Sequence, residues 1–291
     1  MPDFLVEQDD VCIFVTEACN SNCIMCPMSL DSRKRGQRLT VEQWQQLSTV
    51  LPPGITHITV TGGEPFLEHN DLIPALGFLS SSYPNAEILI LTNGRILSLQ
   101  SIFEQLLPLI TEQFCFAIPI HAPEAALHDK ITQSPGSFSQ TLSALRMLKH
   151  TPAKIEIRIV GHQLNIDLIS DTIKMLVDSD LRITIINIIG MEMMGCAAAH
   201  RKELWVDYDL LCKAAFPGIQ YAIHHGTDMS LYNFPLCTVP KGLWPLVKNS
   251  ITPYKVRYYD ECRNCKEYNA CGGLFYSTYE LNLCHIKPFE G

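Results

Sequence analysis

Short runs of β-branched and aliphatic residues alternate with amphipathic stretches along most of the chain. Six apolar runs are typical of strands: 11–16, 57–61, 87–92, 114–120, 154–160 and 182–189. Six segments of helical length have apolar residues three and four positions apart: 41–50, 71–82, 98–107, 137–149, 167–178 and 206–215. This alternation predicts an α/β fold with a parallel sheet, either an open six-unit barrel or a doubly wound sheet.

The pattern changes after about residue 220, where Pro, Tyr, Trp, Gly and Cys become frequent and the periodicity fades. We therefore predict two domains, residues 1–220 and residues 221–291. Because some seventy residues with few regular elements bury little surface, a metal site is expected to stabilise the second domain.

Composition excludes several classes of protein. The chain has 291 residues, of which 47% are hydrophobic and 18% charged, with a net charge of −8. It has no long run of Lys and Arg, so nucleic acid is not an expected partner. We find neither a secretion signal nor an apolar run of membrane-spanning length, so we expect no membrane association and a cytoplasmic location.

Twelve cysteines are many for a chain without a secretion signal, because cytosolic thiols seldom form disulfides. Metal ligation is the favoured explanation for seven of them, which form two groups: Cys19, Cys23 and Cys26, then Cys237, Cys262, Cys265 and Cys271. Four others are expected to be buried structural thiols: Cys12, Cys115, Cys196 and Cys212. Cys284 is left without an assigned role.

The first cysteine group, C-x3-C-x2-C, directly follows the first predicted strand in a segment whose Asn and Ser residues favour a loop. Three thiolates on such a loop can hold one face of an iron-sulfur cubane and leave its fourth iron open to a small molecule. The alternatives are a zinc site with three cysteines or three unrelated thiols, although the loop has no His to complete a zinc site.

Three motifs together resemble the radical S-adenosylmethionine (SAM) superfamily. They are the cysteine loop after the first strand, Thr61-Gly62-Gly63-Glu64-Pro65 after the second, and Thr92-Asn93-Gly94 after the third. The resemblance covers roughly residues 10–225 and implies a partial (β/α)6 barrel with a SAM-binding [4Fe-4S] cluster. In that family the cluster cleaves SAM to a 5′-deoxyadenosyl radical, which abstracts a hydrogen atom from the substrate.

The resemblance also indicates residues that bind SAM. Gly62, Gly63 and Glu64 would contact the methionyl ammonium, Pro65 stiffens the turn, and Asn93 belongs to the same site. Three weaker candidates follow on later strands and loops: Arg158 for the carboxylate, and Asn165 and Asn187 for the ribose or carboxylate. The family usually has an aromatic residue before the last cysteine, where this chain has Met25, so packing against adenine is expected to differ.

The second group, Cys262-x2-Cys265-x5-Cys271-Gly272-Gly273, has the compact spacing of a cluster-binding knuckle. With Cys237 it could close a four-thiolate site for a second [4Fe-4S] cluster, and a structural zinc has the same requirements. The pattern resembles a reduced form of the auxiliary-cluster (SPASM or twitch) domain of radical SAM peptide maturases. Phe275 stands where the larger version has another cysteine, which indicates one auxiliary cluster.

Several later segments resemble the C-type radical SAM maturase of His-Xaa-Ser peptide systems: 190–192, 204–205, 232–233, 243–245 and the knuckle. The resemblance implies a ribosomally made precursor peptide as substrate, a second radical SAM maturase as partner, and an external electron donor. Because only 18 residues precede Cys19, we expect leader-peptide binding to come from elsewhere.

Two other functions remain open from the sequence. The chain could be a small-molecule radical SAM dehydrogenase or cyclase with one auxiliary cluster, or a non-catalytic subunit that scaffolds a sister maturase. His121, His128 and Asp129 lie near or just beyond the fourth predicted strand, where substrate could reach, but a helix cap and a surface histidine explain the last two as well. His224 and His225 are expected to be structural.

Overall fold

The computed structural model describes residues 4–7, 10–249 and 255–289, and the chain forms two compact units. The first unit consists of Met1–Asn22, Met28–Pro119 and Thr132–Glu156. The second consists of Cys23–Pro27, Ile120–Ile131 and Ile157–Gly291. Among the described residues, no helix has the length and apolar character needed to cross a bilayer.

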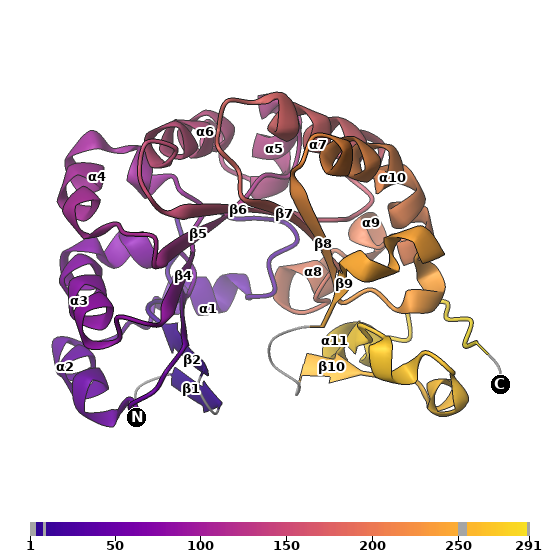
Figure 1. Ribbon diagram of the computed structural model, residues 1–291, viewed down its shortest axis with the longest axis horizontal. Helices are drawn as coiled ribbons and strands as arrows, with labels where there is room; N and C mark the ends of the chain where they lie inside the picture. The colour runs from indigo at the N-terminus through magenta and orange to yellow at the C-terminus, as the bar shows by residue number, and fades with distance from the viewer. Residues whose placement is uncertain (1–3, 8–9, 250–254, 290–291) are drawn as a thin grey trace. The chain divides into compact units, whose positions relative to one another are not determined.

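The first unit is built on a sheet whose strands follow each other in chain order (Figure 1). β1 (Phe4–Glu7) pairs antiparallel with β2 (Asp10–Phe14), and β2, β3 (His57–Thr61), β4 (Glu87–Leu91) and β5 (Phe114–Pro119) are parallel. Its helices are α1 (Leu30–Arg35), α2 (Val41–Val50), α3 (His69–Ser82), α4 (Gln100–Leu106) and α6 (Ser137–Leu148). Buried and half-buried residues alternate along β2 and β4, as expected of strands with one face on a packed core.

The second unit continues the same plan. β6 (Lys154–Val160) begins in the first unit and ends in the second, where β7 (Ile185–Ile189), β8 (Asp228–Tyr232) and β9 (Val247–Lys248) pair in parallel. A short antiparallel pair joins β10 (Val256–Arg257) to β11 (Leu274–Phe275). The helices are α5 (Ala125–Thr132), α7 (Ile169–Asp178), α8 (Gly195–Ala199), α9 (Arg201–Leu204), α10 (Tyr208–His224) and α11 (Tyr276–Glu280).

The α/β prediction is confirmed, and each predicted strand and long helix is found near its predicted place. The helix predicted over 41–50 begins there because Thr40 and Gln43 form a capping box, in which each side chain accepts a hydrogen bond from the other residue's backbone N–H. The strand predicted from residue 182 begins only at Ile185, because Arg182 has a φ of 52°, outside the β region.

Two predictions near residue 220 were wrong. The helix predicted to end at residue 215 runs through Pro217 to His224, and the alternation continues with β8. Close packing of α10 on α7 explains the longer helix, since a Cβ at Gly218 would lie 2.9 Å from the Ser170 Cα atom. The domain boundary at residue 220 stays a prediction.

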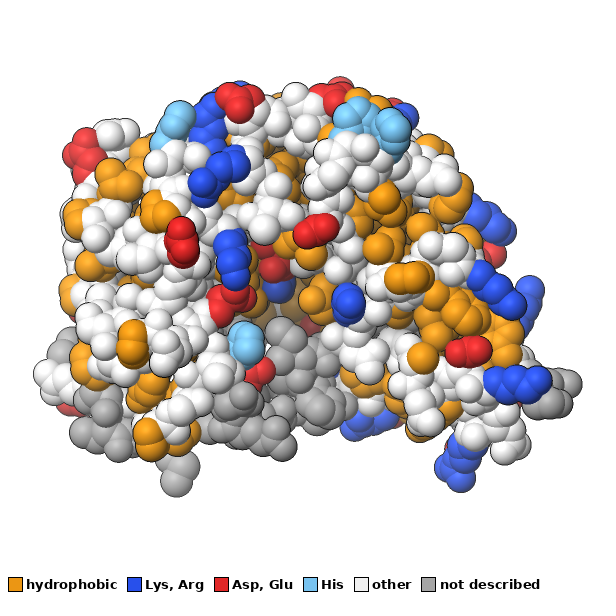
Figure 2. Space-filling model, in the orientation of Figure 1, with side chains coloured by type: hydrophobic (Ala, Val, Ile, Leu, Met, Phe, Trp, Pro, Cys, Tyr) orange, Lys and Arg blue, Asp and Glu red, His pale blue; other side chains and the backbone are white. Residues whose placement is uncertain are grey.

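On the face drawn in Figure 2, basic side chains are interspersed with acidic ones. This distribution agrees with the mixed charge pattern of the sequence.

Candidate functional site

The Gly62-Gly63 turn after β3 lies against the backbone that leads to the first cysteine. A Cβ atom at Gly62 would lie 2.5 Å from the Thr16 carbonyl oxygen, and one at Gly63 would lie 2.2 Å from the Ala18 carbonyl oxygen. The Gly63 N–H donates to the Thr16 carbonyl at 2.6 Å, and the Glu64 N–H donates to the Ala18 carbonyl at 2.8 Å. The two glycines therefore let one loop approach the other closely, a role in addition to the ligand contact predicted for them.

Glu64 lies at the end of the same turn with its carboxyl group fully buried. One carboxyl oxygen accepts hydrogen bonds from the Thr92 hydroxyl at 2.7 Å and the Phe66 N–H at 3.1 Å, and the other accepts from the Asn93 N–H at 2.8 Å. Burial raises the pKa of Glu64 to about 7, and the three hydrogen bonds oppose that rise. The side chain links the end of β3 to the end of β4, so it has a positioning role in the fold, and its predicted contact with the SAM ammonium stays a prediction.

Asn93 connects this turn to Cys19. Its amide Nδ2 donates to the Asn20 side-chain oxygen at 2.7 Å and lies 3.8 Å from the Cys19 sulfur, which also accepts from the Ser21 N–H at 3.4 Å. The guanidinium of Arg95 donates to the Asn20 carbonyl and to the Ser21 hydroxyl. Two donors on one sulfur stabilise the thiolate that cluster ligation requires. Sequence reasoning missed Arg95, although it directly follows the Thr92-Asn93-Gly94 motif.

Cys23 and Cys26 belong to the second unit. The Cys26 N–H donates to the Cys23 carbonyl at 3.2 Å, and the Cys26 carbonyl accepts from the Ala197 N–H at 3.2 Å, so the turn is fixed on α8. Met25, between them, is 7% exposed and packs in an apolar cluster with Met191 and Met193. How Met25 would pack against adenine stays a prediction.

The candidate residues on β6 and β7 differ in their surroundings. Arg158 is half-buried on β6, and its carbonyl accepts from the Ile120 N–H at 3.1 Å. Asn165 is fully buried and is used by the fold, since its amide donates to the His121 and Val160 carbonyls. Asn187 is 3% exposed, and within the described part of the chain its side-chain oxygen has no hydrogen-bond partner. Whether this oxygen meets a ligand stays a prediction.

Three buried histidines lie close together in the second unit. His121, His128 and His162 are each at most 1% exposed, and the rings of His121 and His128 stack 5.5 Å apart. Burial lowers the pKa of His128 and of His162 to about 4 and also lowers the pKa of His121. These imidazoles are therefore neutral at pH 7. The alternative of a surface location for His128 was wrong, since α5 buries it.

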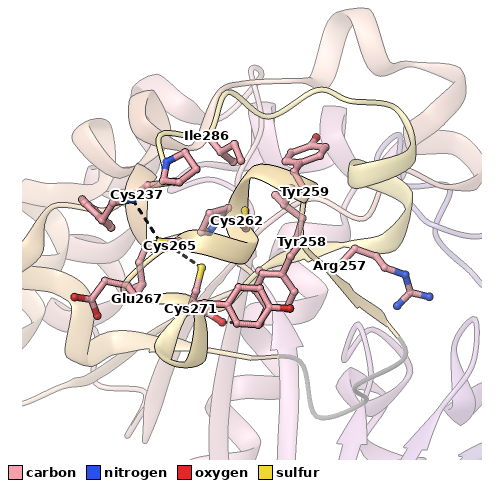
Figure 3. A pocket seen from close by; sticks show the side chains of 16 residues that line it. Cys237, Arg257, Tyr258, Tyr259, Cys262, Cys265, Glu267, Cys271 and Ile286 are labelled. Atoms are coloured by element: carbon pink, nitrogen blue, oxygen red, sulfur yellow. Dashed lines mark hydrogen bonds between the residues drawn. The ribbon is translucent and has the colours of Figure 1, made fainter. Parts of the chain in front are cut away.

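The second cysteine group lines one pocket (Figure 3). Cys237 lies in the 3-10 helix Leu236–Thr238, Cys262 in Asp260–Asn264, and Cys265 and Cys271 directly follow 3-10 helices. All four cysteines, from segments up to 34 residues apart in sequence, surround a space of about 400 Å³ that includes open solvent. Tyr258, Tyr259 and Tyr268 form part of its wall, and the Tyr258 hydroxyl donates to the Cys271 carbonyl at 2.9 Å.

The thiols of this pocket are the donor type that iron-sulfur clusters and structural zinc sites use. Burial raises the pKa of Cys262 to about 11 and raises those of Cys237 and Cys271, so without a metal they hold their protons at pH 7. A metal deprotonates a coordinating thiol outright, and its positive charge offsets the cost of burying the thiolate. Within the described ranges, no three His, Cys, Asp or Glu side chains are placed to hold a single metal ion.

Three of the four cysteines predicted to be buried are buried, and the fourth is only half-buried. Cys115, Cys196 and Cys212 are buried and Cys12 is half-buried. Cys284 is buried, and burial raises its pKa, but it is not among the residues that line the four-cysteine pocket in the described part of the chain.

Comparisons with known proteins extend this picture. The model of the Radical SAM superfamily matches residues 13–191. A probable GTP 3′,8-cyclase from Pyrobaculum aerophilum is 27% identical over 82% of this chain and 75% of its own length. The Bacillus subtilis antilisterial bacteriocin subtilosin biosynthesis protein AlbA is 24% identical over 46% of this chain and 29% of its own length.

The fold is also shared with a solved structure. Streptococcus suis SuiB bound to its precursor peptide SuiA superposes with a TM-score of 0.58 at 13% sequence identity, over 79% of this chain. The chain spans about half the length of SuiB. This likeness establishes the partial-barrel α/β fold.

Proposed function

Because the chain belongs to the radical SAM superfamily, whose model covers more than half of it, we propose that this radical SAM enzyme modifies a ribosomally made precursor peptide. The observation that carries the proposal is the four-cysteine pocket. A second cluster site of this kind is typical of the peptide-modifying branch that the sequence resembles. The likeness to AlbA, a bacteriocin biosynthesis protein, and to SuiB, solved with a precursor peptide, supports the same class of substrate.

In this proposal the first cluster is held by Cys19, Cys23 and Cys26. When bound, the cluster supplies the electron that cleaves SAM to methionine and a 5′-deoxyadenosyl radical. Ser21 and Asn93 place donors at the Cys19 sulfur, and Glu64 holds the turn that supports them.

The SAM-binding residues form a second part of the proposal. Gly62, Gly63 and Glu64 would contact the methionyl ammonium, with Pro65 stiffening the turn and Asn93 in the same site. Arg158, which is half-buried, would bind the carboxylate of SAM. Asn187, whose side-chain oxygen has no hydrogen-bond partner among the described residues, would contact the ribose or carboxylate.

The auxiliary cluster is assigned to Cys237, Cys262, Cys265 and Cys271. Four thiolates close the site, so its roles are to fold residues 221–291 and to relay an electron. Structural zinc is the alternative occupant. We further propose a cytoplasmic enzyme that uses an external electron donor and works with a second radical SAM maturase, as in His-Xaa-Ser systems.

A specific observation favours a second candidate function. The likeness to a probable GTP 3′,8-cyclase extends over most of both chains, which supports a small-molecule cyclase or dehydrogenase. A non-catalytic scaffold subunit is the third possibility.

One set of assays separates these functions. The purified protein, loaded with iron and sulfide without oxygen, is incubated with SAM and dithionite, and 5′-deoxyadenosine is measured; its absence would indicate the scaffold. Candidate precursor peptides encoded beside the gene are then added, and a change in peptide mass that depends on SAM supports the proposal. A mass change in a nucleotide such as GTP, with all peptides unchanged, would contradict it in favour of the cyclase.

A further inference from the structure

The segment Ile286–Phe289, which we call the strap, crosses the four-cysteine pocket. Ile286, Pro288 and Phe289 line the pocket, whereas the side chain of Lys287 is exposed. Figure 3 draws Ile286 with Cys237 and Cys262 among the side chains that line the pocket. The strap is separated from every cysteine of the pocket by at least 15 residues, so its position there depends on tertiary structure.

The strap donates two backbone hydrogen bonds to sulfur. The Lys287 N–H donates to the Cys237 sulfur at 3.3 Å, and the Phe289 N–H donates to the Cys265 sulfur at 3.4 Å. The residue between them is Pro288, which has no N–H. The N–H groups on either side of Pro288 therefore both face the pocket.

Further contacts fix the strap in this position. The Phe289 carbonyl accepts from the Lys266 N–H at 3.0 Å. The backbone of Phe289 therefore bonds both to the Cys265 sulfur and to the next residue, Lys266. The Phe289 ring packs on Trp244, with ring centroids 5.4 Å apart. The two donors are thus held by backbone and aromatic contacts, and do not depend on the side chain of Lys287.

We propose that the strap is part of the auxiliary cluster site, where the N–H groups of Lys287 and Phe289 position Cys237 and Cys265 and raise the reduction potential of the cluster. The inference rests on the proposed auxiliary cluster. Reduction adds a negative charge that spreads onto the sulfurs, so donors to sulfur stabilise the reduced form more than the oxidised form. The strap also covers one side of the pocket and limits the access of water and chelators.

The first test uses the full chain carrying Cys19→Ala, Cys23→Ala and Cys26→Ala, so that only the auxiliary cluster contributes to the spectra. Lys287→Pro and Phe289→Pro each remove one donor, whereas Lys287→Ala and Phe289→Leu are matched controls that keep it. In redox titrations followed by electron paramagnetic resonance, we expect each Pro variant to favour the oxidised form about tenfold more. For a one-electron couple this is a shift of about 59 mV to lower potential. We also expect chelators to remove iron several-fold faster.

The outcomes distinguish the strap from the cluster itself. Four irons bound in the parent, together with the same reduction potential and chelation rate in the parent and the Pro variants, would refute the role proposed for the strap but not the proposed auxiliary cluster. No iron bound in the parent would instead refute the auxiliary cluster, and with it the role of the strap.

A second measurement does not depend on the folding of the Pro variants. The parent is labelled with ¹⁵N-phenylalanine, its cluster is reduced, and nitrogen couplings are recorded by pulsed electron paramagnetic resonance. We expect a ¹⁵N coupling from the Phe289 amide that disappears in Phe289→Leu. A spectrum without that coupling would overturn the proposed hydrogen bond.

Discussion

The approach of the Gly63 turn to the Thr16–Ala18 loop leads to a quantitative prediction for Gly63→Ala. The new methyl group would lie 2.2 Å from the Ala18 carbonyl oxygen and 2.6 Å from the Glu17 carbonyl oxygen, and both are backbone atoms that cannot rotate away. Overpacking of this kind costs typically about 1–3 kcal/mol. Separation of the loops would also weaken two backbone hydrogen bonds worth about 0.5–1.5 kcal/mol each.

Together these effects predict that Gly63→Ala lowers the free energy of unfolding by roughly 2–6 kcal/mol. At about 2–4 °C per kcal/mol, the melting temperature of the metal-free protein should fall by roughly 4–24 °C. The matched control is Gly242→Ala, because a Cβ there meets no atom within 4 Å; it should change stability by at most about 0.5 kcal/mol.

The assay combines calorimetry of the metal-free proteins with iron counts after cluster loading. Because the displaced loop continues directly into Cys19, Gly63→Ala should also bind fewer irons than the parent. If Gly63→Ala has the same melting temperature as the parent and binds as much iron, the close approach of the two loops does not contribute to stability or cluster binding.

The sequence allowed the α/β class and the order of the strands to be predicted because both depend on local pattern. Continuous β-branched runs such as 57–61 correspond residue for residue to a strand. The end of α10 was missed for the opposite reason, since Pro217 is a local signal to stop and the packing of Gly218 on α7 is not local. Tertiary contacts outweighed propensity there.

The residue types of the candidate site could be predicted from motifs, but the hydrogen bonds that hold these residues in place could not. The motif predicts that Glu64 contacts the SAM ammonium, and the structure adds that its carboxylate accepts hydrogen bonds from Thr92 and Asn93, about 28 residues away. No periodicity encodes such a pairing. The strap could not be predicted from the sequence, because its contacts with the cysteine sulfurs are made by backbone N–H groups, and every residue except proline has one.

Four further predictions test other parts of the molecule. Cys26→Ala should abolish SAM cleavage, since a cluster lacking one of three thiolates is poorly held; parent levels of 5′-deoxyadenosine would contradict the assignment. The parent should bind about eight irons, from two four-iron clusters, whereas four irons and one zinc would identify the second site as structural zinc. Cys265→Ala should lower the melting temperature and impair peptide modification more than uncoupled SAM cleavage; unchanged stability with lost cleavage would refute a closed second site. The last prediction concerns His162, whose pKa falls from 6.5 to about 4 on burial. The unfolded chain therefore binds a proton that the folded chain does not, and stability should decrease by about 1.4 kcal/mol per pH unit as pH falls from 6.5 towards 4. Glu64, whose pKa rises to about 7, acts in the opposite direction over pH 7 to 4.5, so total stability is not the test. The measurement is denaturant unfolding of the parent and His162→Gln across this range. The free energy of unfolding of His162→Gln, relative to that of the parent, should increase by about 1.4 kcal/mol for each pH unit of acidification. A difference that does not depend on pH would show that His162 is not buried in its neutral form.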